Sequence, residues 1–169
     1  RKGRWEKPLA VMVSDLASAR QIAALGPEEE KLLTSRERPI VLGRARSDSG
    51  LAPSVSPGLD TVGVMLAYTP LHLLLLREAG EPLVMTSGNA SEMPIATGNE
   101  EAMLSLSGIA DAFLVHDREI VSRYDDSVVR VIGGVPAFLR RARGYAPLPV
   151  PLPQAASVPV LAVGPHLKN

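Results

Sequence analysis

The sequence contains no cysteine among its 169 residues. A disulfide scaffold, a zinc site with cysteine ligands and catalysis by a thiol are therefore all excluded within this chain. Aromatic residues make up only 4%, so the core has to be aliphatic. No run of about 18 apolar residues occurs, and a membrane span is not expected. The chain opens on Arg1 inside a charged segment, without a signal peptide, which suggests a start within a longer protein and favours the cytoplasm.

An excess of charge of one sign is also missing. The 18 Lys and Arg residues balance 18 Asp and Glu residues, giving a formal net charge of zero. Proteins that wrap nucleic acid usually carry a large positive balance, so nucleic acid is not the expected partner. The composition, with 46% apolar and 21% charged residues, is that of a globular domain.

Short apolar runs alternate with amphipathic stretches, which predicts an α/β fold with a mixed sheet. We expect strands at 8–13, 39–43, 62–68, 83–85, 112–115, 127–132 and 135–139. We expect helices from an N-cap at Ser14 through Leu25 with Gly26 closing it, from Pro27, from Thr69 to Glu78, and from a cap at Asn99 to Leu106. Gly133-Gly134 between the last two strands indicates a tight hairpin.

Basic side chains gather in front of the first expected strand. Residues 1–7 carry four positive charges and one negative charge. Lys2 and Arg4 are two apart, so in an extended segment they point the same way, with Lys7 close behind. Two such cations can grip adjacent phosphate oxygens. The alternative is a solubilising surface run.

A polar loop, Thr86-Ser87-Gly88-Asn89, directly follows the short strand at 83–85. Ligands of α/β sheets bind beyond the carboxyl ends of strands. The loop offers two hydroxyls, an amide and a glycine that lets backbone approach a ligand closely. The alternative is a polar turn with Asn89 in a left-handed conformation.

Three arginines, Arg140, Arg141 and Arg143, follow the last hairpin strand, and Ser127 begins that hairpin. Such a cluster suits an anion. Neighbouring residues on a strand face opposite sides, so Arg140 is expected toward a ligand and Arg141 away from it. The alternative is an edge strand that its charges protect from aggregation. No two histidines have a metal-like spacing, and neither a metal site nor a catalytic side chain is expected.

Together these motifs resemble the Sua5/YrdC family. The resemblance rests on three segments in order along the chain: Lys2-Gly3-Arg4 with Lys7-Pro8-Leu9, Thr86 to Ser91 with Pro94, and Asp126-Ser127-Val128-Val129. A closer likeness is to the YrdC-like domain of the hydrogenase-maturation carbamoyltransferases, the HypF family. It is carried by 51–53, 55–59, 63–66, 68–72, 109–114, 116–118 and 140–147.

The resemblance implies a YrdC-like twisted mixed sheet with flanking helices, truncated at its N-terminus. Residues 1–146 would form this nucleotide-binding domain, and 147–159 a proline-rich linker. Residues 160–169 resemble the first strand of a Kae1-like domain. A chain of this extent is expected to be unable to complete the overall reaction alone.

The resemblance also implies a reaction. Carbamate derived from carbamoyl phosphate attacks ATP, giving carbamoyl adenylate, and the carbamoyl group passes to the C-terminal cysteine of a partner, HypE. ATP with Mg²⁺ would be required, whereas zinc belongs only to upstream domains absent here. By motif, the nucleotide-binding residues would be Lys2, Arg4, Lys7, Thr86, Ser87, Asn89, Ser127 and Arg140. The alternatives are a threonylcarbamoyl-AMP synthase serving tRNA modification and a double-stranded RNA-binding module.

Overall fold

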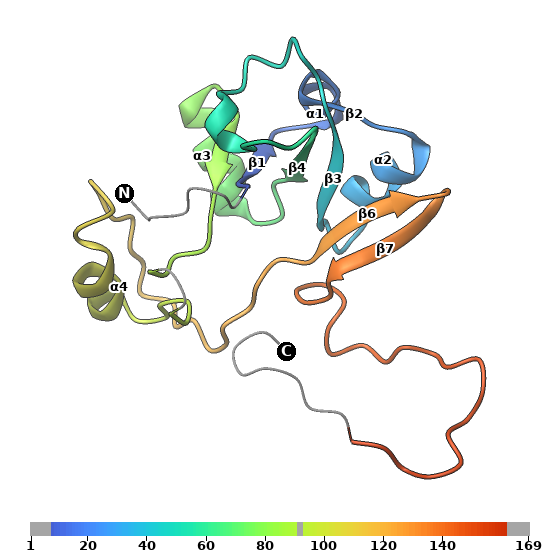
Figure 1. The fold of residues 1–169 in the computed structure, drawn as a ribbon. Coiled ribbons are helices and arrows are strands. Elements are labelled where there is room, and N and C mark those ends of the chain that lie inside the picture. The colour runs from blue at the N-terminus through green and yellow to red at the C-terminus, as the bar shows by residue number, and fades with distance from the viewer. Residues whose placement is uncertain (1–7, 91–92, 162–169) are drawn as a thin grey trace.

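A mixed β-sheet forms the centre of the computed structural model, which describes residues 8–90 and 93–161 (Figure 1). Its strands are β1 (Ala10–Val13), β2 (Ala23–Ala24), β3 (Ile40–Ala45), β4 (Thr61–Leu66), β5 (Leu83–Met85), β6 (Val128–Ile132) and β7 (Val135–Arg140). They are ordered β5-β1-β4-β3-β6-β7, with β2 pairing β3. β1 runs parallel to β4, and β3 runs parallel to β6, whereas the other pairs are antiparallel. The expected α/β class with a mixed sheet is confirmed.

Helices cover both faces of this sheet. They are α1 (Leu16–Ile22) and α2 (Pro27–Thr34) on one face and α3 (Pro70–Ala79) on the other. A fourth helix, α4 (Asn99–Leu106), lies apart from the sheet (Figure 1), and a 3-10 turn spans Pro53–Val55. Along β1 the side chains alternate between the faces. Val11 and Val13 pack in one apolar cluster with residues of α1 and α2, whereas Met12 packs in a second cluster with Leu76 of α3. Both clusters of buried residues are free of aromatic side chains, as the composition led us to expect.

Local signals fix the helix ends. The Thr69 hydroxyl accepts a 3.1 Å hydrogen bond from the His72 N–H at the start of α3, and Gly80, at φ +68°, ends that helix. Pro27 begins α2 with three glutamates in its first turn, as predicted. Gly133 and Gly134 both have positive φ, which the two-residue turn between β6 and β7 requires.

Three helix boundaries differ from the sequence-based expectation: both ends of α1 and the start of α4. The first helix does not run from Ser14 to Leu25. Its N-cap is Asp15, and it ends at Ile22 because the next two residues pair with β3. Gly26, expected to close α1, is instead the N-cap of α2, and Gly98 rather than Asn99 caps α4.

The expected strand at 112–115 is wrong. These residues form no strand, and Leu114 and Val115 are 69% and 49% exposed. A short apolar run becomes a strand only where a neighbouring strand supplies hydrogen bonds, and no strand of the described chain pairs with this run.

The chain after β7 makes one turn and then extends away from the sheet (Figure 1). Residues 147–161 contain neither helix nor strand. The division of the chain into domain, linker and next strand stays a prediction, and 162–169 lie outside the described residues. Among the described helices, none is long and apolar enough to cross a membrane.

Candidate functional site

The loop after β5 is closed by its own polar groups. The Ser87 hydroxyl donates a 2.6 Å hydrogen bond to the amide oxygen of Asn89, whose Nδ2 donates to the Met93 carbonyl at 2.6 Å. The Ala96 N–H donates to the Gly88 carbonyl at 3.0 Å. Ser87 and Asn89 therefore present their side chains at one place. The left-handed conformation weighed for Asn89 is wrong, because Arg38 is the only non-glycine residue with positive φ among those described.

Arg123 links the chain just after this loop to helix α4. Its Nε donates to the Ile95 carbonyl at 2.7 Å, and its Nη2 lies 3.7 Å from a Glu101 carboxylate oxygen. Asn99 adds a 2.9 Å hydrogen bond to the His116 carbonyl. The segment that contains His116 and Arg123 and leads to β6 thus anchors the polar loop. No local sequence pattern predicted this role.

The strand register places the polar loop beside the start of β1. Met85 pairs with Ala10, so Thr86 leaves β5 at the edge of the sheet where Leu9 enters β1. The Leu9 N–H donates to the Val55 carbonyl at 2.8 Å, which fixes this entry. Lys2, Arg4 and Lys7, the expected phosphate-binding residues, lie outside the described residues.

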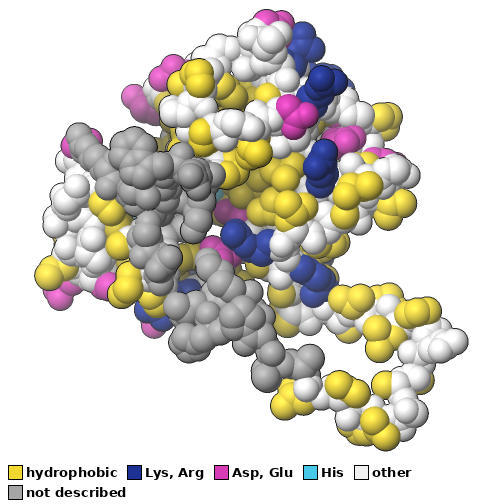
Figure 2. Space-filling model, in the orientation of Figure 1, with side chains coloured by type: hydrophobic (Ala, Val, Ile, Leu, Met, Phe, Trp, Pro, Cys, Tyr) yellow, Lys and Arg dark blue, Asp and Glu magenta, His cyan; other side chains and the backbone are white. Residues whose placement is uncertain are grey.

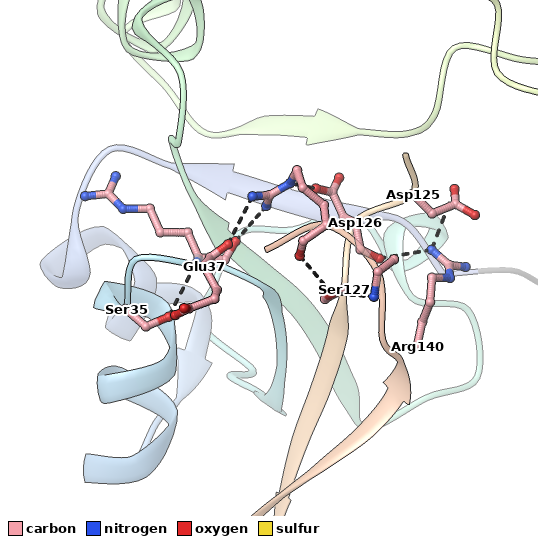
Figure 3. Close-up of polar contacts among 9 residues, drawn as sticks. Ser35, Glu37, Asp125, Asp126, Ser127 and Arg140 are labelled. Atoms are coloured by element: carbon pink, nitrogen blue, oxygen red, sulfur yellow. Dashed lines mark hydrogen bonds and ion pairs between the residues drawn. The ribbon is translucent and has the colours of Figure 1, made fainter. Parts of the chain in front are cut away.

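A second polar group forms where β6 begins and β7 ends (Figure 3). Ser127 is 0% exposed. Its hydroxyl donates to the Arg143 carbonyl at 2.9 Å and accepts from the Ala142 N–H at 2.8 Å. Both hydrogen-bonding directions of this hydroxyl are therefore used to hold the chain that follows β7.

Arg140 and Arg141 turn to different partners. Arg140 is the last residue of β7 and Arg141 lies beyond it, so strand alternation does not account for the difference. Arg140 Nη1 donates a 3.4 Å hydrogen bond to the Asp126 carbonyl and lies 3.9 Å from an Asp125 carboxylate oxygen. Its side chain remains 43% exposed. Arg141 Nη2 instead donates to the Leu148 carbonyl at 2.7 Å. Arg140 is thus the arginine of this pair that lies beside Asp126 and Ser127.

The two polar groups stand at opposite ends of the strands. Through the paired strands, Met85 lies level with Arg130, whereas Ser127 precedes β6 at its other end. β1, β4 and β3 separate β5 from β6, and four strand spacings amount to about 19 Å across the sheet. A ligand that contacts both groups has to be extended and lie across the sheet.

A partly buried polar cluster adjoins Ser127. The Arg143 guanidinium binds Asp126 and stacks on the ring of Tyr68, with 3.4 Å from its central carbon to the ring centroid. The Tyr68 ring meets the His72 ring edge to face, with centroids 4.5 Å apart. Burial, with the Asp126 carboxylate next, raises the pKa of Tyr68 to about 12. Burial also lowers the pKa of His72, which favours a neutral imidazole.

Sequence reasoning gave Tyr68 and Asp126 no role, although both lie within the motifs that carry the resemblance. Two surface grooves lie elsewhere. One is lined by Arg20, Gln21, Arg46, Asp48 and Ser49, and the other lies between α1 and α3. Within the described ranges, no three His, Cys, Asp or Glu side chains gather as metal ligands would. On the face drawn in Figure 2, basic and acidic side chains are interspersed.

Comparison with known proteins identifies relatives over the whole chain. A model of the Sua5/YciO/YrdC family, described by the words "Telomere recombination", matches residues 1–142. The carbamoyltransferase HypF2 of Cupriavidus necator is 52% identical over 188 aligned residues, and the carbamoyltransferase HypF of Synechocystis is 48% identical over 169. Both alignments cover 100% of this chain, but only 23% and 22% of those proteins. The chain thus spans less than a quarter of their length.

Solved structures share the fold. A full-length HypF in a phosphate- and nucleotide-bound form superposes with a TM-score of 0.83 at 50% identity, covering 86% of this chain and 23% of that one. Pyrococcus abyssi Sua5 complexed with L-threonine superposes at 0.69 with 20% identity, covering 82% of this chain and 41% of that one, which supports the fold alone. The threonylcarbamoyl-AMP synthase of Bacillus subtilis is 34% identical over 63% of this chain and 32% of its own length.

Proposed function

The chain belongs to the Sua5/YciO/YrdC family, and on that premise we propose that it is the nucleotide-binding part of a carbamoyltransferase of the HypF type. In this role it binds ATP and forms carbamoyl adenylate. The observation that carries the proposal is the alignment of the whole chain with carbamoyltransferases at about half identity. The similar structure that holds phosphate and nucleotide supports ATP as the ligand.

The proposed reaction needs little proton transfer from the protein. A carbamate oxygen attacks the α-phosphorus of ATP, the new O–P bond forms, and the bond to the β-phosphate breaks to release pyrophosphate. What the protein supplies is alignment of the two reactants and neutralisation of phosphate charge. Polar and cationic side chains suffice for this, and the two groups described above supply Thr, Ser, Asn and Arg side chains, with Asp125 and Asp126 beside Arg140.

We assign the residues as follows. Thr86, Ser87 and Asn89 bind the adenylate region, and Arg140 binds an anionic group at the other end of the site. Ser127 acts indirectly, because its hydroxyl is used in holding the chain beside Arg140. The triphosphate is assigned to three further cations by motif: Lys2, Arg4 and Lys7. Mg²⁺ enters with ATP, held mainly by phosphate oxygens and water.

The carbamoyl group then passes to the C-terminal cysteine of HypE, in the cytoplasm. The chain itself has no cysteine that could compete as an acceptor. Carbamoyl phosphate is the source of the carbamate, and segments of the relatives beyond the matched region release it. Release of carbamate and transfer of the carbamoyl group therefore belong to the whole protein that we propose. The matched relatives are more than four times as long as this chain, which leaves room for the segments that perform these two steps.

ATP–pyrophosphate exchange tests the adenylation step directly. The purified chain is incubated with ATP, Mg²⁺ and labelled pyrophosphate, with ammonium carbamate in one reaction and threonine plus bicarbonate in another. We expect exchange that depends on carbamate. Exchange with threonine and bicarbonate alone would replace the proposal by a threonylcarbamoyl-AMP synthase. A chain that binds no ATP in a calorimeter would exclude both activities.

A further inference from the structure

Arg143 is held by the protein through all three of its guanidinium nitrogens. Nε lies 2.7 Å from an Asp126 carboxylate oxygen, Nη1 donates to the Glu37 carbonyl at 3.0 Å, and Nη2 donates to the Arg38 carbonyl at 2.9 Å. The face of the guanidinium lies on the Tyr68 ring. Its side chain is 23% exposed. An arginine bound in this way has little capacity left for an external anion, although its two neighbouring arginines have more.

The loop that receives Arg143 is shaped for it. Arg38 has a φ of +43°, a region that non-glycine residues occupy only when the surroundings compensate. In this conformation the carbonyls of Glu37 and Arg38 both accept from the one guanidinium, while the Arg38 side chain donates to the Ala67 carbonyl. Three chain segments that are distant in sequence thus meet at Arg143.

Gly144 brings the chain after β7 against this loop. Its φ is +88°, and a Cβ at this position would meet Glu37 Cβ at 2.9 Å, Cα at 3.0 Å and the carbonyl oxygen at 3.1 Å. Two of these three atoms belong to the backbone and cannot swing aside. A glycine is therefore required here for both reasons, conformation and space.

Arg143 also fixes the segment that leads into β6. Its N–H donates to the Asp125 carbonyl at 3.1 Å, its side chain binds the Asp126 carboxylate, and its carbonyl accepts from Ser127 Oγ. One residue thus contacts three consecutive residues, each through a different group. Arg140 lies beside the same segment, at the Asp126 carbonyl and the Asp125 carboxylate. Its direction therefore depends on where Arg143 holds that segment.

We propose that Arg143 is a positioning residue of the candidate nucleotide site, which fixes the 125–127 segment and thereby sets the direction in which Arg140 meets the ligand. This inference rests on the proposed function for the identity of the ligand. In this proposal Arg140 contacts the ligand, whereas Arg143 contacts only the protein. The sequence alone could not make this division, because both residues are arginines after the same strand.

The experiment measures ATP binding to the full 169-residue chain by calorimetry for Arg143→Lys, Arg140→Ala and the double variant, with Arg141→Lys as the matched control. Lysine keeps the charge but lacks the planar fork. We expect Arg143→Lys to raise the Kd for ATP about tenfold, the loss of roughly one charge-assisted hydrogen bond. Arg141→Lys should leave it unchanged. In the Arg140→Ala background, Arg143→Lys should add little, because it acts through Arg140.

A second variant and a second readout keep the test decisive. Gly144→Ala retains every charge but pushes the chain away from Glu37, so it should weaken ATP binding as Arg143→Lys does. Hydrogen exchange of the amides at 125–127 and 141–144 should become faster in both variants. If Arg143→Lys does not fold, Gly144→Ala decides alone.

The outcomes separate the two claims. Additive effects of Arg140→Ala and Arg143→Lys, or folded variants that bind ATP like the unmodified chain, would overturn the positioning role. An unmodified chain that binds no ATP would overturn the proposed function. In that case the hydrogen-exchange comparison still reports whether Arg143 fixes the 125–127 segment, and unchanged exchange would overturn that statement as well.

Discussion

The hydroxyl of Ser127, a residue that is 0% exposed, donates a 2.9 Å hydrogen bond to the carbonyl of Arg143 across sixteen residues of sequence. The same hydroxyl accepts from the Ala142 N–H at 2.8 Å. A serine that the family resemblance places in a nucleotide site thus joins the start of one hairpin strand to the segment after the other. Loss of the Ser127 hydroxyl should therefore affect both the stability of the fold and the binding of the ligand.

Replacing Ser127 with alanine should destabilise the fold. The Ala142 N–H and the Arg143 carbonyl both lose a partner, and leaving a buried group unpaired costs about 1–3 kcal/mol. The two hydrogen bonds are partly buried, so the lower end of that range applies. The free energy of unfolding, measured with urea, should fall by at least about 1 kcal/mol. Ser107→Ala is the control, because the exposed Ser107 hydroxyl bonds only the nearby Leu104 carbonyl. Equal effects of the two variants would contradict this interpretation of Ser127.

Arg140 and Arg141 should differ in ATP binding. Arg140→Ala removes the exposed cation beside Asp126 and should weaken ATP binding about tenfold, the loss of roughly one charge-assisted contact. Arg141→Ala should do little, because that side chain donates to the Leu148 carbonyl instead. Calorimetric titration of both variants with ATP checks the difference. Equal losses would mean that the charge of the cluster acts diffusely rather than through one directed side chain.

Features of the fold that depend on residues close in sequence were predictable, and features that depend on contacts between distant segments were not. The hairpin at Gly133-Gly134 and the cap at Thr69 follow from local backbone requirements, and both are present. The early end of α1 was not predictable, because it results from the pairing of Ala23 and Ala24 with β3. The apolar run at 112–115 gave a strand-like pattern, but pairing depends on neighbours that a local pattern does not contain.

The candidate site shows the same division. Ser87 and Asn89 were expected to act together, and they bond each other two residues apart. The role of Arg143 was hidden, because its partners Glu37 and Arg38 lie more than a hundred residues away in sequence. A cluster of arginines predicts affinity for anions, but only the fold shows which of them the protein itself has already bound.

His72 should make stability depend on pH near neutrality. Burial lowers its pKa in the folded state, so the neutral form favours folding. This contribution is fully present above the unfolded pKa of about 6.5 and is lost as the pH falls through the lower folded value. Urea unfolding at several pH values checks it, with His72→Phe as the comparison. The variant should lose less stability between pH 7 and pH 5 than the unmodified chain, and an equal loss would show that His72 is not the group responsible.

The last prediction concerns transfer to a partner. Carbamoyl adenylate reacts with water, so a transferring enzyme has to enclose it and pass it directly to the acceptor. In the curated relatives, more than three quarters of the length lies outside the region matched by this chain. We therefore expect the 169-residue chain, given carbamoyl phosphate, ATP and HypE, to leave the acceptor cysteine unmodified. Mass spectrometry of HypE after incubation checks this, with a full-length HypF protein as the positive control. A HypE heavier by one carbamoyl group in the presence of this chain alone would show that the remaining segments are dispensable for both delivery and transfer.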